Sequence, residues 1–273
     1  MKHPILAAFA LSLAFPALAY AQDLPPSVAS SKTLRVAIVP NYPPLDYKDP
    51  ATGKLTGFDV ELGEALAAKL GLKLAWQETS FDQMMPAIAT DRVDMVLSGM
   101  SDVATRHDAA SFVDYLKSGP QFLAQASRAA EFADMKALCG KKVGASRRTN
   151  FPGEIAAWSK ANCPEDKPVV FVGTEGSADA RTQLRQGRID AAVQGGETLP
   201  YVMSQDPGTF VGLGKPIATQ YTGIATGPKA DGLQKALSGA LDALIADGSY
   251  AKLLAKWQLD GMGVERATIN AGQ

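Results

Sequence analysis

Short apolar, strand-like runs alternate with segments of helical periodicity, and this order limits the possible folds of the chain more than any other feature. The run at 34–39 (LRVAIV) is followed by apolar residues at helical spacing over 58–70. Gly71 is well placed to end that helix. Further strand-like runs follow at 72–76 and 93–97. Strand–helix–strand order joins parallel strands through helices that cover the sheet, so we predict an α/β fold.

The same order then starts a second time. The predicted strands are 142–146, 168–173 and 189–193, and the predicted helices between them are 155–161 and 180–186. A strand at 221–226 and two more helices, the last ending at Trp257, follow this second unit. The chain therefore contains two α/β units of about a hundred residues each.

The first 21 residues, MKHPILAAFALSLAFPALAYA, have the form of a secretory signal peptide. Lys2 supplies the positive charge, an apolar run extends over 5–15, and Ala19-Tyr20-Ala21 is an A-x-A cleavage site. The alternative is a buried N-terminal helix. Residues 22–33 are polar and contain Pro and Ser, which predicts a flexible leader.

Charge and composition exclude several classes of protein. The 273 residues carry 27 Lys+Arg against 28 Asp+Glu, without a basic run, which argues against nucleic-acid binding. One of the two His is lost with the leader, which leaves His107 and argues against a His-rich metal site or a His-based triad. No phosphate-binding loop or zinc spacing is present, so no cofactor and no metal are implied.

Cys139 and Cys163 are the only two cysteines of the chain. Export makes a disulfide between them possible. The alternative is a pair of free, buried thiols.

Three predicted strand ends are rich in small or polar residues. They are 98–101 (SGMS), 147–150 (RRTN) and 194–197 (QGGE). Ligands of open α/β sheets bind beyond the carboxyl ends of the strands, where helix N-termini also point. Arg106 follows the first of these ends and is placed to reach back and bind a carboxylate, although a solvated helix residue is an equal alternative.

Two aromatic residues and two arginines also border these ends. Tyr42 lies in a Pro-rich turn and Phe81 precedes a predicted helix, where either side chain could flank a ligand. Taken alone, each is better explained by core packing. Arg147 and Arg148, taken alone, are better explained as a surface turn.

The combined motifs resemble the family 3 extracellular solute-binding proteins, the polar amino-acid receptors of ABC importers. The resemblance covers nearly all of 34–258 and is carried by 42–45 (YPPL), 55–62 (LTGFDVEL), 81–88 (FDQMMPAI), 98–101, Arg106, Phe112, Asp114, 138–144 (LCGKKVG), 187–191 (GRIDA), 247–250 (DGSY) and 256–257 (KW).

This resemblance implies a two-lobed periplasmic-binding-protein fold of the type II, Venus-flytrap kind, with two hinge crossings. Lobe 1 would comprise 34–120 and 221–260, lobe 2 would comprise 121–220, and 261–273 would be a tail. A periplasmic monomer would then capture an amino acid or related small carboxylate by hinge closure and deliver it to an ABC permease in the inner membrane.

The resemblance also assigns roles in ligand binding. Arg106 is similar to the arginine that holds the ligand α-carboxylate, Ser101 to its hydroxyl partner, and Gly99 to the residue whose carbonyl meets the amino group. Thr149 is similar to the second-lobe threonine at a helix N-terminus. The full predicted set is Tyr42, Phe81, Ser98, Gly99, Ser101, Arg106, Arg148, Thr149, Gly195 and Glu197.

Three departures from the family pattern concern the ligand. Gly195 stands where the family has the aspartate that pairs with the ligand ammonium. Glu197 could replace that aspartate, or could simply occupy the first turn of a helix. Val39 replaces the acid of basic-amino-acid receptors, and Arg147-Arg148 adds positive charge before Thr149. Together these predict an acidic or amino-group-poor ligand.

Two other functions fit the same scaffold. Secreted cyclohexadienyl dehydratases resemble this family and use cleft carboxylates for acid–base chemistry, and Glu197 is the one new cleft acid available for it. A receptor that signals through a membrane partner would use the same closed form.

Overall fold

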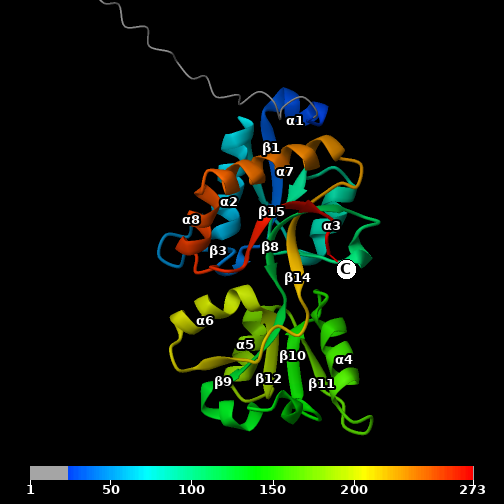
Figure 1. The fold of residues 1–273 in the computed structure, drawn as a ribbon, viewed down its shortest axis with the longest axis vertical. Coiled ribbons are helices and arrows are strands. Elements are labelled where there is room, and N and C mark those ends of the chain that lie inside the picture. The colour runs from blue at the N-terminus through cyan, green and yellow to red at the C-terminus, as the bar shows by residue number, and fades with distance from the viewer. Residues whose placement is uncertain (1–23, 273) are drawn as a thin grey trace, which may run out of the picture.

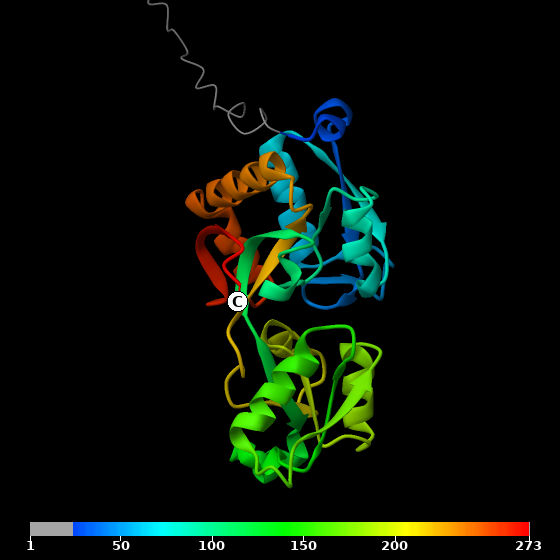
Figure 2. The same ribbon diagram turned by 90° about the vertical axis from the view of Figure 1, so that its right-hand side faces the viewer.

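The computed structural model describes residues 24–272 and shows two α/β lobes connected by extended segments (Figures 1 and 2). The predicted signal peptide, 1–21, lies outside the described residues. Lobe 1 contains a seven-stranded sheet and lobe 2 a five-stranded sheet. The predicted fold class is confirmed.

The sheet of lobe 1 has the order β15-β8-β14-β6-β1-β5, with β7 paired to β14. Its strands are β1 (Thr33–Ile38), β5 (Lys73–Glu78), β6 (Met95–Val96), β7 (Ser101–Asp102), β8 (Ser111–Ser118), β14 (Gln220–Thr226) and β15 (Gly263–Ile269). A small second sheet consists of β2 (Asn41–Tyr42), β3 (Asp46–Lys48) and β4 (Leu55–Thr56). The helices are α1 (Pro26–Ser31), α2 (Phe58–Leu70), α3 (Phe81–Ala89), α7 (Asp231–Ala246) and α8 (Ser249–Lys256), with a 3₁₀ turn η1 (Ala104–Arg106).

The sheet of lobe 2 has the order β11-β10-β12-β9-β13. Its strands are β9 (Pro120–Gln125), β10 (Lys142–Ser146), β11 (Val170–Thr174), β12 (Ala191–Gly195) and β13 (Phe210–Leu213). Its helices are α4 (Phe151–Asn162), α5 (Ser177–Arg185) and α6 (Leu199–Gln205), with 3₁₀ segments η2 (Ala126–Phe132), η3 (Met135–Leu138) and η4 (Gly196–Thr198).

Each lobe has helices on both faces of its sheet. In lobe 1, α2, α7 and α8 share one core with alternate residues of β1, and α3 packs on the opposite face. In lobe 2, α4 covers one face, and α5 and α6 cover the other. The predicted helix end at Gly71 is confirmed, because this residue has the left-handed φ of 65° that glycine adopts without steric penalty.

The chain crosses between the lobes twice, once from β8 to β9 through Gly119 and once from β13 to β14. The two crossing segments touch each other: a β-carbon added to Gly119 would lie 1.8 Å from the carbonyl oxygen of Ala218. The amide of Ile217 also donates to the carbonyl of Pro120 at 2.8 Å. Glycine at 119 is therefore required for the two crossing segments to approach each other this closely.

The predicted flexible leader is wrong for its described part. Residues 26–31 form α1, whose Val28 is buried in the core of lobe 1, and β1 already begins at Thr33. Pro26 occupies the first helical position, where a missing N–H costs nothing. Polar composition predicted a loose segment, whereas Leu24 and Val28, four residues apart, anchor it to the core.

The predicted tail is also wrong. Residues 263–269 form β15, an edge strand antiparallel to β8. The end of the chain then returns toward the junction of the lobes, as both ribbon views show (Figures 1 and 2). Pairing with β8 satisfies backbone groups of this strand, and only the tertiary fold brings the two segments together.

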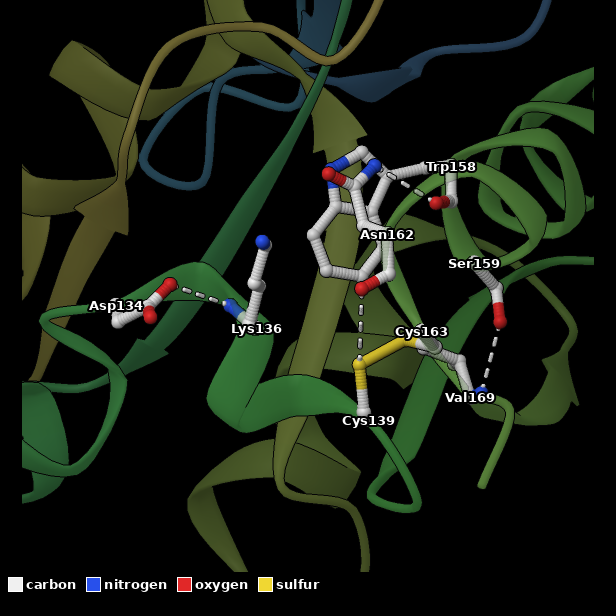
Figure 3. Close-up of a disulfide and its surroundings, with 8 residues drawn as sticks. All are labelled: Asp134, Lys136, Cys139, Trp158, Ser159, Asn162, Cys163 and Val169. Atoms are coloured by element: carbon white, nitrogen blue, oxygen red, sulfur yellow. Dashed lines mark hydrogen bonds between the residues drawn. A yellow bond between two sulfur atoms is a disulfide. The ribbon is translucent and has the colours of Figure 1, made fainter. Parts of the chain in front are cut away.

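Cys139 and Cys163 form a disulfide, as predicted, with their Cα atoms 5.4 Å apart. It joins the residue after η3 to the residue that ends α4 (Figure 3). Nearby, the amide of Val169 donates to the hydroxyl of Ser159 at 2.9 Å and holds the start of β11 against the same helix. The disulfide therefore lies within lobe 2, at one end of α4.

Replacing both cysteines by serine is expected to lower the free energy of unfolding of lobe 2 by about 3–4 kcal/mol, because the bridge closes a loop between residues 24 positions apart. The Tm should fall by about 10 °C in calorimetry. Reductant should produce a similar fall in the wild type and no further fall in the double variant. An unchanged Tm in the variant would contradict this expectation.

Candidate ligand-binding site

A cavity of about 160 Å³ lies between the lobes, at the carboxyl ends of strands from both sheets. From lobe 1 it is lined by Val39, Asn41, Tyr42, Ser80, Phe81, Ser98, Gly99 and Ser101. From lobe 2 it is lined by Ser146, Arg148, Thr149, Asn150, Phe151, Glu175, Gly176 and Ser177. Parallel strands direct all their carboxyl ends to one edge of a sheet, so these segments meet although they are far apart in sequence.

Gly99 forms part of the floor of this cavity. Its φ is 59°, and a β-carbon there would lie 2.9 Å from the ring of Tyr42. Its amide donates to Asp59 at 2.8 Å, and the hydroxyl of Tyr115 donates to the other oxygen of that carboxylate at 2.8 Å. Burial raises the pKa of Asp59 to about 7. Asp59 lies in the motif at 55–62, which gave no signal of a role for it, and in the structure its carboxylate holds the floor in place.

Ser98 lines the cavity, but its hydroxyl already has partners inside lobe 1. It accepts from the amide of Val39 at 3.1 Å and donates to the buried Asp46 at 3.0 Å. Its side chain therefore ties β1 to the segment after β6. Direct ligand contact by Ser98 stays a prediction.

Thr149 has a similar local role at the start of α4. Its hydroxyl donates to the carbonyl of Ser146 at 3.0 Å and accepts from the amide of Phe151 at 3.2 Å. It lines the cavity beside Asn150 and Phe151, which the sequence analysis missed as candidates. Asn150 is the last residue of the predicted strand end at 147–150 and Phe151 directly follows it, which was the available signal.

Arg106 lies beside the cavity without lining it. It is the last residue of the 3₁₀ turn η1. Its guanidinium donates to the carbonyl of Ser101 at 2.6 Å and lies 5.8 Å from the ring centroid of Phe81. It forms no salt bridge with any carboxylate of residues 24–272. Burial lowers the pKa of this guanidinium because it disfavours the charged form. An anionic partner would stabilise that charge.

Arg147 and Arg148 do not add unbalanced positive charge. Arg148 contacts Glu175 at 2.9 Å, and Arg147 pairs with the same carboxylate. Arg148 also reaches Asp82 of lobe 1 at 3.8 Å. The sequence analysis missed Glu175, which comes to this place because β10 and β11 are parallel neighbours with Ser146 opposite Thr174. These two arginines therefore do not favour an acidic ligand, and the ligand class stays a prediction.

Gly195 and Glu197 lie in a smaller recess that also contacts Tyr42, Gly99 and Ser101. A β-carbon added to Gly195 would lie 1.9 Å from a carboxylate oxygen of Glu197. Glu197 itself lies in η4, immediately before α6, and is 4% exposed. Glu197 thus lies in a helical segment, as one alternative predicted, and its carboxylate occupies the space of a side chain at 195. Pairing of Glu197 with a ligand ammonium stays a prediction.

Known proteins that this chain resembles show its family. The family model of the bacterial extracellular solute-binding proteins, family 3, matches residues 34–260.

The chain belongs to this family.

Two curated relatives show how far the similarity of this solute-binding protein extends. The L-arginine-binding protein of Pseudomonas aeruginosa is 30% identical over 85% of this chain and 90% of the relative. The ABC transporter arginine-binding protein 1 of Escherichia coli is 27% identical over 94% of this chain and 99% of the relative. A solved structure, an ancestral arginine-binding protein bound to arginine, superposes with a TM-score of 0.74 at 28% identity, covering 83% of this chain and 98% of its own.

None of the helices formed by residues 24–272 of this solute-binding protein has the length and apolar character needed to cross a bilayer. Within the same residues, no group of three or more His, Cys, Asp or Glu side chains is arranged to hold a metal ion.

A second group of buried acids in the solute-binding protein lies behind Arg106. Asp102 and Asp114 are both fully buried, and the ring of His107 approaches Asp102 at 2.5 Å. His107 is itself half-buried. Burial, and then the negative charge of Asp102, raise the pKa of Asp114 to about 7.

The stability of this solute-binding protein is expected to fall as the pH rises from about 4 to 7. The pKa values of Asp59 and Asp114 are both about 7 in the folded chain, against about 3.9 when unfolded, so the folded state binds more protons in that range. Urea denaturation should give a larger free energy of unfolding at pH 5 than at pH 8. Asp114→Asn should reduce this difference, and an unchanged difference would count against Asp114 as its source.

Proposed function

We propose that this protein captures an L-amino acid in the periplasm by closing its two lobes, and delivers it to an ABC permease without chemical conversion. The observation that supports this most directly is Arg106. A half-buried guanidinium at the edge of an interlobe cavity, with no carboxylate partner among the described residues, is suited to a ligand carboxylate.

Several further features support the same proposal. The A-x-A leader predicts export, and the family is extracellular by name. One relative is named as an ABC transporter component, which favours transport over signalling. Against catalysis, both carboxylate oxygens of Glu197 already accept hydrogen bonds, from Tyr42 at 2.8 Å and Ser118 at 2.5 Å. A general acid or base must instead reach the reacting group.

We propose a ligand with an uncharged polar side chain. The charged groups at the cavity, Arg148 and Glu175, pair with each other, and Arg148 also approaches Asp82. The remaining polar lining is made of hydroxyl and amide side chains such as Ser80, Asn150 and Ser177. Such groups form hydrogen bonds with a neutral side chain without leaving a buried charge unpaired.

The test is isothermal titration of the mature protein, unfolded and refolded to remove any bound solute. The panel should contain glutamine, asparagine, serine, arginine, histidine, glutamate and succinate. Binding of glutamine, asparagine or serine supports the proposal. Binding of succinate alone would overturn the amino-acid assignment, and conversion of prephenate or arogenate to an aromatic product would overturn the absence of catalysis.

A further inference from the structure

A set of hydrogen bonds behind the cavity connects the two lobes and the hinge. The hydroxyl of Tyr42, in β2 of lobe 1, donates to Glu197 of lobe 2 at 2.8 Å. The same hydroxyl accepts from the amide of Gly195 at 3.1 Å. The hydroxyl of Ser118, one residue before Gly119 of the first crossing, donates to the other oxygen of Glu197 at 2.5 Å and accepts from its amide at 3.1 Å.

The bond between Tyr42 and Glu197 can exist only when the lobes are together. Glu197 is 4% exposed in this arrangement, and Tyr42 and Ser118 supply the side-chain donors to its two oxygens. In the closed arrangement the Glu197 carboxylate is buried, and loss of a hydrogen-bond donor there carries a large energetic penalty. In the open arrangement water can replace that donor. The hydroxyl of Tyr42 therefore stabilises the closed arrangement specifically.

The hydrogen bond between Tyr42 and Glu197 requires glycine at position 195. A β-carbon at 195 would lie 1.9 Å from Glu197 Oε1 and 2.4 Å from the Tyr42 hydroxyl. Any other residue at 195 would therefore separate the two groups. The glycine at this position and the Tyr42–Glu197 hydrogen bond thus depend on each other.

Two other contacts between the lobes are weaker candidates for holding them together. Arg148 and Asp82 are 3.8 Å apart and both about half exposed, a geometry that contributes little in water. The rings of Tyr47 and Tyr201 lie 5.6 Å apart at a tilted angle. Neither contact removes a charge from solvent in the way that the Tyr42–Glu197 contact does.

We propose that Tyr42 and Glu197 form a closing latch that populates the closed form before any solute binds. Glu197 then acts as a positioning residue for the lobes rather than as the partner of a ligand ammonium. A receptor that is already partly closed uses less of its binding energy for closure, so the latch increases affinity without contacting the solute. The proposal concerns lobe closure and does not depend on which ligand class is correct.

The test measures closure without any ligand. Spin labels on cysteines introduced at Ala68 in α2 and Gln205 in α6, both exposed, report the distance between the lobes of the refolded, solute-free protein. Tyr42→Phe keeps the ring that lines the cavity and removes only the hydroxyl. We expect the closed-to-open ratio to fall about tenfold in this variant, with an unchanged Tm. A closed fraction equal to that of the wild type would overturn the proposal.

Two further variants separate a latch from a general effect on stability. Tyr221→Phe removes a hydroxyl for which no hydrogen bond is found within residues 24–272, so its distance distribution should match that of the wild type. Glu197→Gln should open the lobes, and the double variant with Tyr42→Phe should open them no further than the more open single variant. Fully additive opening would show that the two residues act independently and would overturn the latch. Because no ligand is used, failure here leaves the amino-acid titration unaffected.

Discussion

Replacement of Arg106 by lysine is expected to raise the Kd for the bound amino acid at least about a hundredfold. The planar guanidinium can give a carboxylate two parallel hydrogen bonds, which an ammonium group cannot reproduce. Charge-assisted hydrogen bonds contribute about 1.5–3 kcal/mol each, and one such bond lost at the upper end of that range already accounts for the expected change. Isothermal titration with the tightest ligand of the panel is the measurement.

The stability of the Arg106→Lys variant distinguishes a ligand clamp from a structural residue. Burial lowers the pKa of Arg106, and its hydrogen bond within the protein is to the Ser101 carbonyl. We therefore expect an unchanged or slightly raised Tm, because groups kept for function often lower stability. Arg128→Lys is the matched control, since Arg128 pairs with Asp190 in lobe 2, and its Kd should not change. A large loss of stability with normal binding would contradict the assignment of Arg106.

Gly119→Ala is expected to affect both the fold and the binding of ligand. Its β-carbon would overlap the carbonyl oxygen of Ala218 at 1.8 Å, and both partners of this clash are backbone. The two crossing segments must then move apart, and we expect the free energy of unfolding to fall by about 3 kcal/mol. The Kd should rise as well, because the same segments set how the lobes meet.

Urea denaturation and titration of the same preparation test this expectation. Gly153→Ala is the control, because Gly153 lies in α4 with open space around its missing β-carbon. Alanine has the higher helix propensity, so this change should leave the protein as stable as before or slightly more stable. Equal behaviour of the two variants would show that the close approach of Gly119 and Ala218 is not required.

The α/β class and much of the local structure could be predicted from the sequence. The strand at 142–146 coincides with β10, and the helix end at Gly71 is correct, because periodicity and a glycine in the left-handed region are local signals. Strands β8, β9 and β13 were not predicted. Among them, β8 has six consecutive buried residues. It therefore lacks the alternation of buried and exposed residues by which a strand is recognised in a sequence. The leader and the tail were mistaken because burial there depends on distant partners.

The candidate site, like the fold, was predicted from the sequence only in part. Of the three strand ends predicted to bind a ligand, 98–101 and 147–150 line the cavity, whereas 194–197 lies at the smaller recess. Glu175, Asp46 and Asp59 were missed, because their roles arise from neighbours across the sheet and not from neighbours along the chain. The family resemblance favoured Arg106 as a clamp over a solvated helix residue, and it marked Gly195 as a departure from the pattern. The role of Arg106 stays a prediction.

The sequence by itself determined the α/β class and the family, and it limited any disulfide to Cys139 and Cys163, because periodicity, the number of cysteines and ordered motifs are properties of the chain alone. Only the tertiary structure decided how charge is distributed at the cleft. It places Glu175 against Arg147 and Arg148, and it places Glu197 in the space of a side chain at 195. The physical reason is that a hydrogen bond or an ion pair acts over a few ångströms in space, and residues far apart along the chain come that close only when the sheets and the two crossings have formed.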